Sequence, residues 1–416
     1  MGLKGIEKIL QRDLEQLEAE GRLKGKECII TGVKRAAGSK GPRYFLQGKG
    51  EQEFIRMNSN SYLGMSFRDE LLAAEERTAG EYGVGPGAVR FISGTFKPHR
   101  ELEKRLALFH QRDDAMLVSS AYSTVVGVLV PLITASTIII SDELNHNSII
   151  NAIRLSRPKD KKIYKHLDMN DLEDKVKESV HNGNRLIIVT DGIFSMRGDL
   201  APLDIISNLS RKYDPEFPEN VILVVDDSHG VGAFGETGRG TEEYTRAEGV
   251  DILIGTLGKA FGVNGGYVTS SQTIITYLRE TAPTYIYSNP ISAAEASAAL
   301  KSLEILDSER GKGILKHLYQ MTKRFEQGLG DLGYEIIVSD HPIVPLMVRD
   351  TGKTANLVNY LMQRGILATG LTYPVVPRGD EEIRFQVNAD HTPDDIDYTL
   401  EVLKIYSTGL SCKEAG

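Results

Sequence analysis

Cysteine and basic charge are both scarce in this sequence. Only two of the 416 residues are cysteine, Cys28 and Cys412, and they lie near opposite ends of the chain. This spacing forms neither a metal-ligand motif nor a disulfide framework, and it favours a reducing compartment. The formal net charge is −8. A nucleic-acid binder needs a basic excess to neutralise phosphates, so the charge argues against that class of partner.

Long hydrophobic runs are also missing. The longest apolar stretch, Ile252 to Val268, is interrupted by Lys259, Asn264 and several glycines. A membrane-spanning helix needs roughly 20 predominantly apolar residues, so we expect no membrane span. The opening segment MGLKGIEKILQRDLEQLEAE mixes acids with apolar residues and has no apolar core of the signal-peptide kind. These absences together predict a cytoplasmic protein.

The remaining composition is that of a globular protein, with 41% hydrophobic and 25% charged residues. A single hydrophobic core stops growing at roughly 250–300 residues, so we expect more than one domain. We place an N-terminal helix and arm at 1–60, a large domain at 61–305 and a smaller α+β domain at 306–416. Ile6, Ile9, Leu10 and Leu14 recur at helical spacing, which predicts an N-terminal helix that ends near Gly21. The apolar side of this helix must pack either on a partner subunit or on its own chain.

Short apolar runs alternate with helical segments through the middle of the chain. The runs typical of buried strands are Ala115–Val118, Thr137–Ile140, Leu186–Thr190, Val221–Val225 and Ile252–Ile254. This alternation predicts an α/β fold with a mainly parallel sheet covered by helices on both faces. Further strands are expected beyond residue 305, at Tyr334–Val338, Ile343–Val348, Ile366–Thr369 and Ile383–Val387. Ligands of parallel sheets bind beyond the carboxyl ends of the strands, so residues following each run are the first candidates.

Two of these strand ends carry chemically suitable residues. Asp226 ends one run, and Lys259 follows the next within the Gly-rich segment GTLGKAFG, with Thr256 just before it. A lysine that forms a Schiff base and a carboxylate that keeps a pyridine nitrogen protonated fit pyridoxal 5'-phosphate. The same residues also fit a solvated loop lysine and a helix-capping aspartate. Spacing alone therefore leaves both interpretations open.

Longer segments resolve this ambiguity. DGIFSMRGDLAPL, VVDDSHGVGAFGETGRG and DILIGTLGKAFGVNGGYV closely resemble the α-oxoamine synthase family of pyridoxal phosphate enzymes. SDELNHNS, YIYSNP and YPVVPRG…IRFQVNADHT are similar to its glycine C-acetyltransferase branch. The resemblance spans roughly residues 50–400. It implies a fold-type I transferase, with a large domain built on a mainly parallel seven-stranded sheet and a smaller C-terminal α+β domain.

The resemblance also implies residue roles around the cofactor ring. Lys259 would carry the cofactor and Asp226 would pair with its pyridine nitrogen. His229 would hydrogen-bond the phenolic oxygen, with Ser195 near the same atom, and His146 would stack on the ring face. A structural histidine remains the alternative for both His229 and His146.

The cofactor phosphate is expected at a composite site. Ala121 and Tyr122 begin a predicted helix, whose free N–H groups and dipole favour a dianion. Thr256 would add a hydroxyl. Ser288 and Asn289, in YIYSNP, match residues that reach the phosphate from the other subunit in this family, so the resemblance implies a homodimer with a shared site. An ordinary turn before Pro290 is the alternative for this pair.

Arg384 matches the family arginine that binds the substrate carboxylate, and Asn60 matches its helper. A guanidinium offers the planar fork that a carboxylate needs. Three segments depart from the family pattern: Phe96–Pro98, Asn147, and SSAYSTVVG, which lacks a usual asparagine. They resemble segments that line the acyl pocket, so they bear on the acyl donor.

The resulting expectation is an acyltransferase that condenses an amino acid with an acyl-CoA and releases CoA. Glycine and acetyl-CoA are the first choice, giving 2-amino-3-oxobutanoate or its decarboxylated aminoketone. Serine or alanine with a longer acyl-CoA is the alternative within the family. A lyase that cleaves β-hydroxy amino acids without CoA is the alternative from another class, since a fold does not determine a reaction. A subunit that has lost catalysis is disfavoured because Lys259, Asp226, His229 and Arg384 are all present.

Overall fold

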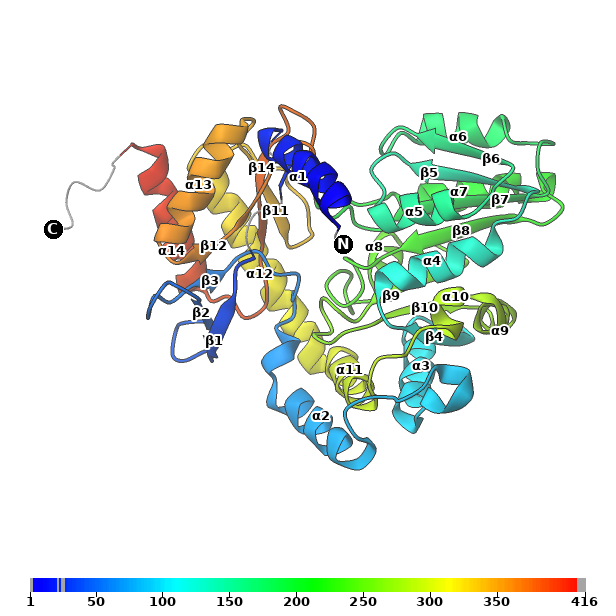
Figure 1. Ribbon diagram of the computed structural model, residues 1–416, viewed down its shortest axis with the longest axis horizontal. Helices are drawn as coiled ribbons and strands as arrows, with labels where there is room; N and C mark the ends of the chain where they lie inside the picture. The colour runs from blue at the N-terminus through cyan, green and yellow to red at the C-terminus, as the bar shows by residue number, and fades with distance from the viewer. Residues whose placement is uncertain (1–2, 21, 24–26, 410–416) are drawn as a thin grey trace. The chain divides into compact units, whose positions relative to one another are not determined.

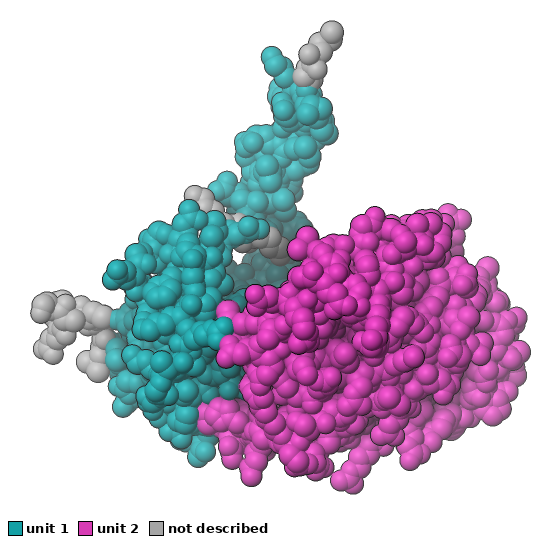
Figure 2. Space-filling view, turned by 90° about the horizontal axis from the view of Figure 1, so that it is seen from below, with its two compact units in different colours: residues 1–59, 323–338, 343–416 teal, residues 60–322, 339–342 magenta. Residues whose placement is uncertain are grey.

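The computed structural model describes residues 3–20, 22–23 and 27–409. The chain forms two compact units, coloured separately in Figure 2. Unit 1 contains residues 1–59, 323–338 and 343–416, and unit 2 contains residues 60–322 and 339–342. The chain passes from unit 2 into unit 1 within helix α12 (Glu309–Asp331), whereas the sequence places a boundary near residue 305.

Unit 2 is built on a seven-stranded sheet, which confirms the predicted fold class (Figure 1). Its strand order is β4-β10-β9-β8-β7-β5-β6. β10 is antiparallel to both its neighbours, and the other pairs are parallel. The strands are β4 (Asp114–Val118), β5 (Thr137–Asp142), β6 (Asp160–Tyr164), β7 (Arg185–Asp191), β8 (Val221–Asp226), β9 (Ile252–Thr256) and β10 (Gly266–Ser270).

Helices cover this sheet because its central strands are apolar on both faces. Alternate strand residues such as Val189, Val224 and Ile254 join one continuous core with residues of α4, α5 and α9. Other helices also pack against single strands: α3 contacts β4, α6 contacts β6 and α7 contacts β8. The helices of unit 2 are α2 (Asp69–Tyr82), α3 (Lys97–Phe109), α4 (Ala121–Leu132), α5 (Asn147–Leu155), α6 (Met169–Lys177), α7 (Leu203–Tyr213), α8 (Thr241–Thr245), α9 (Gln272–Thr281), α10 (Pro283–Ile286) and α11 (Ala293–Leu306).

The structure adds two strands that hydrophobic runs did not predict. β6 has the sequence DKKIY and lies at the sheet edge, where one ladder partner suffices and exposed charges are favourable. β10 is the antiparallel strand, and its sequence GYVTS lies inside the longest apolar stretch together with β9. A turn around Lys259 separates these two strands, so one apolar stretch becomes an antiparallel pair.

Unit 1 contains smaller sheets. β11 (Ile343–Met347), β14 (Glu382–Gln386) and β13 (Thr369–Leu371) form one of them in that order. β1 (Ile30–Lys34) pairs with β2 (Arg43–Leu46), and β3 (Ile55–Arg56) pairs with β12 (Ile366–Leu367). The expected strand at Tyr334–Val338 is wrong, because that segment makes only an isolated bridge between Ile336 and Leu346. The helices in the C-terminal part of this unit are α13 (Thr351–Gln363) and α14 (Pro393–Ser407).

The predicted N-terminal helix is present as α1 (Lys4–Ala19). Its expected end near Gly21 lies outside the described residues. No residue of α1 is buried, and Ile6, Ile9, Leu10 and Leu14 each expose about half of their surface. Packing of this apolar side on its own unit is therefore not observed. Among the described residues, no helix is long and apolar enough to cross a membrane.

Candidate active site

The carboxyl ends of β7, β8 and β9 surround a cavity in unit 2. Asp191 and Asp226 end neighbouring strands and stand opposite each other in the sheet register. The lining residues are Ala121, Tyr122, His146, Ser148, Asp191, Ile193, Ser195, Asp226, Ser228, His229 and Lys259. The fold thus brings together most of the residues predicted to contact the cofactor, from segments far apart in the sequence.

Asp226 is held at the end of β8 by the residue two positions later. Its Oδ1 accepts hydrogen bonds from the Ser228 backbone N–H at 3.1 Å and from Ser228 Oγ at 2.6 Å. Asp226 is 6% exposed, so its carboxylate is largely shielded from water. Ser228 was not among the predicted site residues, although its place directly after a strand end was visible in the sequence.

Its neighbour Asp227 has a structural role instead. The Asp227 carboxylate accepts hydrogen bonds from the Thr241 backbone N–H (2.7 Å) and from Thr241 Oγ1 (2.6 Å). Burial raises the pKa of Asp227 to about 7, against the lowering effect of these hydrogen bonds. A Cβ at Gly240 would lie 1.9 Å from this carboxylate, so only glycine fits there. Of the two consecutive aspartates, Asp226 is the one that lines the cavity.

His229 contacts a tyrosine that the sequence did not single out. The Tyr62 hydroxyl lies 2.7 Å from His229 Nδ1 and donates to Asn60 Oδ1 at 3.2 Å. A His229 tautomer with its proton on Nδ1 donates to that same hydroxyl. His341 Nε2 lies 2.9 Å from the His229 backbone oxygen. Predicted Asn60 is therefore connected to His229 through Tyr62.

Lys259 lies in the turn between β9 and β10 and is half-buried in the cavity. The Gly262 N–H donates to the Lys259 backbone oxygen at 3.1 Å. Gly262 has a φ of +77°, and a Cβ there would lie 2.7 Å from the Ser66 backbone nitrogen. Thr256 Oγ1 accepts from the Gly258 N–H at 3.1 Å and is not among the lining residues. The glycine-rich turn thus presents one lysine side chain to the cavity.

The amino end of α4 forms another side of the cavity. Ser120 caps this helix by accepting from the Ser123 N–H at 3.1 Å, and Ala121 and Tyr122 line the cavity. A Cβ at Gly266 of β10 would lie 2.5 Å from the Ala121 nitrogen, so glycine permits the close approach of sheet and helix. Free N–H groups and the helix dipole make this end suitable for a phosphate.

His146 caps α5 and is tied to the end of β7. Its Nδ1 accepts from the Ser148 N–H at 3.2 Å, and its backbone N–H donates to Asp191 Oδ2 at 3.0 Å. Burial lowers the pKa of His146, and the positive charge of Lys259 acts in the same direction, whereas the Asp226 carboxylate raises it. Burial also raises the pKa of Asp191 well above its ordinary value, and the charge of Asp226 adds to this effect. A neutral imidazole is thus favoured in the cavity.

Five predicted residues do not line this cavity: Asn60, Thr256, Ser288, Asn289 and Arg384. Ser288 is half-buried and Asn289 is exposed, in the segment between α10 and α11. Arg384 lies on β14 of unit 1, where its register partners are Pro345 and Thr369. Their roles remain predictions.

The donor set of the cavity fits pyridoxal 5'-phosphate. A lysine amine, a buried carboxylate at a strand end and a helix amino terminus match the aldehyde, ring nitrogen and phosphate of that cofactor. No group of three or more His, Cys, Asp or Glu residues suited to a metal ion occurs in the described part of the chain. The fold and the cavity thus define a fold-type I pyridoxal phosphate enzyme.

Comparisons with known proteins agree with this class and narrow it. The family model "Aminotransferase class I and II" matches residues 52–403. An 8-amino-7-oxononanoate synthase of Petrotoga mobilis is 39% identical over 393 residues, covering 94% of this chain and 95% of the relative. The 2-amino-3-ketobutyrate coenzyme A ligase of Escherichia coli is 38% identical over 395 residues, covering 94% and 95%. The chain belongs to the α-oxoamine synthase family of pyridoxal phosphate-dependent acyltransferases.

A solved structure supports the fold independently. The Sphingomonas wittichii serine palmitoyltransferase superposes with a TM-score of 0.86 at 25% sequence identity, covering 99% of this chain and 100% of that one. The matched length includes both units, so each unit has a counterpart in a known fold.

Proposed function

We propose that this enzyme condenses glycine with acetyl-CoA, releasing CoA and forming 2-amino-3-oxobutanoate or its decarboxylated aminoketone. The observation that supports a carbon–carbon bond-forming acyltransferase is the single cavity that holds Lys259, Asp226, His229 and His146. The similarity to 2-amino-3-ketobutyrate coenzyme A ligases supports the choice of substrates.

Each residue has a defined task in this proposal. When bound, pyridoxal phosphate supplies an electron sink that makes the α-proton of the amino acid acidic. The buried Asp226 carboxylate keeps a proton on the ring nitrogen, because a nearby negative charge favours the protonated form. The Lys259 amine removes the α-proton as a general base. His229 donates to the ring oxygen, and the largely neutral His146 covers the ring face.

Substrate binding rests on residues outside the cavity. We propose that the Arg384 guanidinium binds the α-carboxylate of the amino acid, with Asn60 assisting. In Arg384→Lys, loss of the bidentate, charge-assisted contact should cost roughly 1.5–3 kcal/mol, which raises the KM for the amino acid about tenfold to a hundredfold. The KM for the acyl-CoA should stay unchanged. Equal losses toward both substrates would contradict this assignment.

A second candidate uses serine or alanine with a longer acyl-CoA. The relatives named 8-amino-7-oxononanoate synthase are as similar to this chain as those named 2-amino-3-ketobutyrate coenzyme A ligase, at 39% and 38% identity. The compounds in these two names differ in chain length, so similarity alone does not identify the acyl group. Phe96, Pro98 and Asn147 depart from the family pattern in segments that resemble acyl-pocket segments. We infer that the acyl pocket is reshaped around these residues.

A substrate panel separates these candidates. Acetyl- and longer acyl-CoAs are each mixed with glycine, alanine, serine or threonine, and CoA thiol release is measured together with the product mass. Glycine with acetyl-CoA should give the highest kcat/KM. Strong preference for a longer donor would favour the second candidate, and cleavage of threonine without CoA would indicate the lyase. If kcat/KM for acetyl-CoA exceeds that for every longer acyl-CoA by orders of magnitude, the inference of a reshaped acyl pocket is wrong.

We also propose that two copies of the chain form a homodimer with shared sites. Ser288 and Asn289 do not line the cavity of their own chain, which fits a contribution to the partner's phosphate site. The exposed apolar side of α1 fits a subunit interface. Two-fold pairing is also the commonest form of soluble oligomer.

Hybrid dimers test this arrangement. Lys259→Ala and the double variant Ser288→Asp/Asn289→Asp, which repels the phosphate, should each be inactive. Refolding the two together should restore activity, since one site of a hybrid receives both defects and the other receives neither. If hybrids form but remain inactive, Ser288 and Asn289 act within their own chain.

A further inference from the structure

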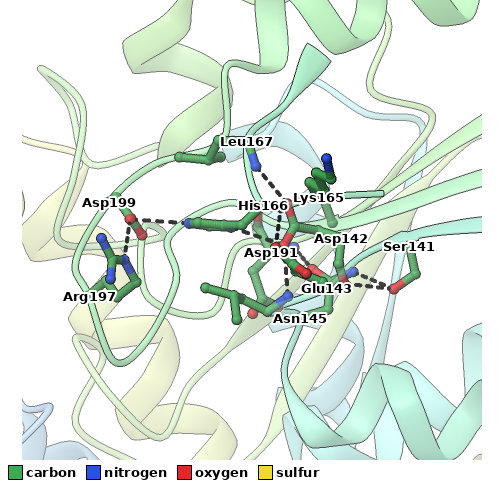
Figure 3. A network of polar contacts seen from close by, with 12 residues as sticks. Ser141, Asp142, Glu143, Asn145, Lys165, His166, Leu167, Asp191, Arg197 and Asp199 are labelled. Atoms are coloured by element: carbon green, nitrogen blue, oxygen red, sulfur yellow. Dashed lines mark hydrogen bonds and ion pairs between the residues drawn. The ribbon is translucent and has the colours of Figure 1, made fainter. Parts of the chain in front are cut away.

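A charged cluster around His166 joins Asp142, at the end of β5, to Asp199 in the segment that carries Ser195; Figure 3 shows its contacts. We call residues 192–200, which follow β7, the Ser195 loop. Within it, the Phe194 N–H donates to the backbone oxygen of Asp199 at 3.0 Å, and the Gly198 N–H donates to the backbone oxygen of Phe194 at 2.9 Å. Ile193 and Leu200 pair as an isolated bridge. The loop is thus a small closed hairpin that places Ser195 and Ile193 against the cavity.

His166 connects this loop to the sheet. Its Nδ1 lies 3.0 Å from Asp142 Oδ1 at the end of β5, and its Nε2 lies 3.2 Å from Asp199 Oδ2 in the loop. Its ring also packs edge-on against Phe194, with centroids 4.4 Å apart. The His166 side chain is 14% exposed. One imidazole therefore reaches a strand end with one nitrogen and the Ser195 loop with the other.

Only a protonated ring makes both contacts as a donor. A neutral imidazole has one N–H and can donate to one carboxylate, whereas an imidazolium has two. Burial by itself would lower the pKa of His166, but the hydrogen bonds and negative charges of Asp142 and Asp199 raise it to about 9. The geometry and the charge of the ring thus agree.

The surrounding groups stabilise the same arrangement. Asp142 also accepts from the Leu144 N–H at 2.8 Å and from the Leu167 N–H at 3.1 Å. The other titratable or charged groups that face the cluster are Glu143, Arg197, Tyr164 and Asp191. Glu143 accepts from the His166 backbone N–H at 2.8 Å, and Arg197 Nε donates to Asp199 at 2.9 Å. Burial raises the pKa of Tyr164 and that of Asp191, and the negative charge of Asp142 acts in the same direction on both. Arg197 offsets one carboxylate of the pair and His166 bridges both.

We propose that protonated His166 is a positioning residue, whose double ion pair to Asp142 and Asp199 holds the Ser195 loop closed on the cofactor cavity. Loss of the proton leaves one carboxylate without its donor, so the loop opens more often. The consequence for Ser195 and the cofactor rests on the proposed function, whereas the bridge between loop and sheet does not.

Hydrogen exchange on the full-length protein tests the bridge without substrate. At pH 7, the amides of Phe194 and Gly198 should exchange at least about tenfold faster in His166→Gln than in the wild type, because their hydrogen bonds open with the loop. Lys165→Gln is the matched control, since it removes a neighbouring positive charge from an exposed side chain and should exchange like the wild type. Asp199→Asn, which removes the negative charge on the loop side of the bridge and also weakens the Arg197 contact, should exchange faster as well.

The pH dependence distinguishes this role from simple packing. After correction for the intrinsic rise of exchange with pH, the wild-type loop should approach the His166→Gln rate as the pH passes about 9. A difference that persists unchanged well above this pH, or equal protection of the loop in wild type, His166→Gln and Asp199→Asn at pH 7, would overturn the proposal. Failure of the proposed acyltransfer is a separate outcome. In that case the loop amides of the wild-type protein are protected from exchange, but the protein releases no CoA from acyl-CoA and amino acid.

Discussion

Two sides of the candidate active site are held together by different forces. On the β8–β9 side, Asp226, Ser228 and Lys259 are positioned by hydrogen bonds between residues close in sequence. On the β5–β7 side, His166 joins Asp142 and Asp199, which come from separate segments, through ion pairs (Figure 3). Local hydrogen bonds depend little on pH, whereas the ion pairs require a charged imidazole. The first side should persist over a broad pH range, and the second should weaken in alkali.

The difference follows the chemistry that each side performs in the proposed reaction. Asp226 must stay in one place beside the cofactor ring, and it is nearly fully buried against a serine that follows it directly. Ile193 and Ser195 of the Ser195 loop line the cavity, and a loop joined to the sheet by a few charged contacts can open at low cost. Burial shields the inner residues, while His166 retains partial contact with water.

The largest expected effect comes from removing the lysine of the β8–β9 side. Lys259→Ala should lower kcat for CoA release by roughly 10²–10⁴-fold, which is what a positioned general base contributes to the rate. The visible absorption band of the bound cofactor should disappear as well. Absorbance and steady-state kinetics on the purified variant measure both effects. A variant that keeps its band and its activity would show that Lys259 is not the cofactor lysine.

Asp226→Asn should have the next largest effect. The amide keeps the shape and can still accept from Ser228, but it no longer holds a proton on the ring nitrogen. We expect kcat to fall about tenfold to a hundredfold, equivalent to losing a charge-assisted hydrogen bond of roughly 1.5–3 kcal/mol. Asp227→Asn, at the structural neighbour, is the matched control and should change thermal stability more than kcat. Similar kinetic losses in both variants would mean that Asp226 supports the fold rather than the chemistry.

The β5–β7 side should show its charge dependence in stability. The folded-state pKa of His166, about 9, lies above its ordinary value of 6.5, so folding favours the protonated form. The added stability is fully present below pH 6.5 and is lost as the pH rises through about 9. The difference in Tm between wild type and His166→Gln should therefore shrink over this range. Melting curves at a series of pH values measure it, and a constant difference would show that the ring acts by packing alone.

The smallest effect is expected for Ser228→Ala. This change removes the 2.6 Å hydrogen bond from Ser228 Oγ to Asp226 but leaves the backbone N–H contact in place. Because both groups are buried, the free energy of unfolding should fall by about 1–2 kcal/mol. Activity should fall less than tenfold, as judged by CoA release. A loss as large as that of Asp226→Asn would show that the hydroxyl takes part in the reaction.

The sequence predicted the central strands because buried parallel strands consist of continuous apolar runs, and β5, β7 and β8 have that composition. It missed β6, where charged residues are tolerated at an edge, and β10, which shares one apolar stretch with β9. It also suggested a strand at Tyr334–Val338, where the structure has only a single bridge. Apolar composition does not specify the pairing that turns such a segment into a strand.

The cavity residues show the same division. Asp226, His229 and Lys259 were predicted because each belongs to a recognisable segment at a strand end. Tyr62, Ser228 and Asp191 also contribute to the cavity or contact His229, yet neither spacing nor resemblance assigned them a role. Asp191 ends a strand, as Asp226 does, so a search of every strand end in the sequence would have found it.

The amino-acid sequence by itself determined the fold class, the cofactor and the chemical identity of the central residues. These properties depend on local composition and on short segments, which can be read along the chain. Only the tertiary structure showed that the Asp227 carboxylate is anchored to Thr241 and that His166 joins Asp142 to Asp199. Both depend on burial and on distances between residues remote in sequence, because a carboxylate's partners and the charge of an imidazole are set by what packs around them.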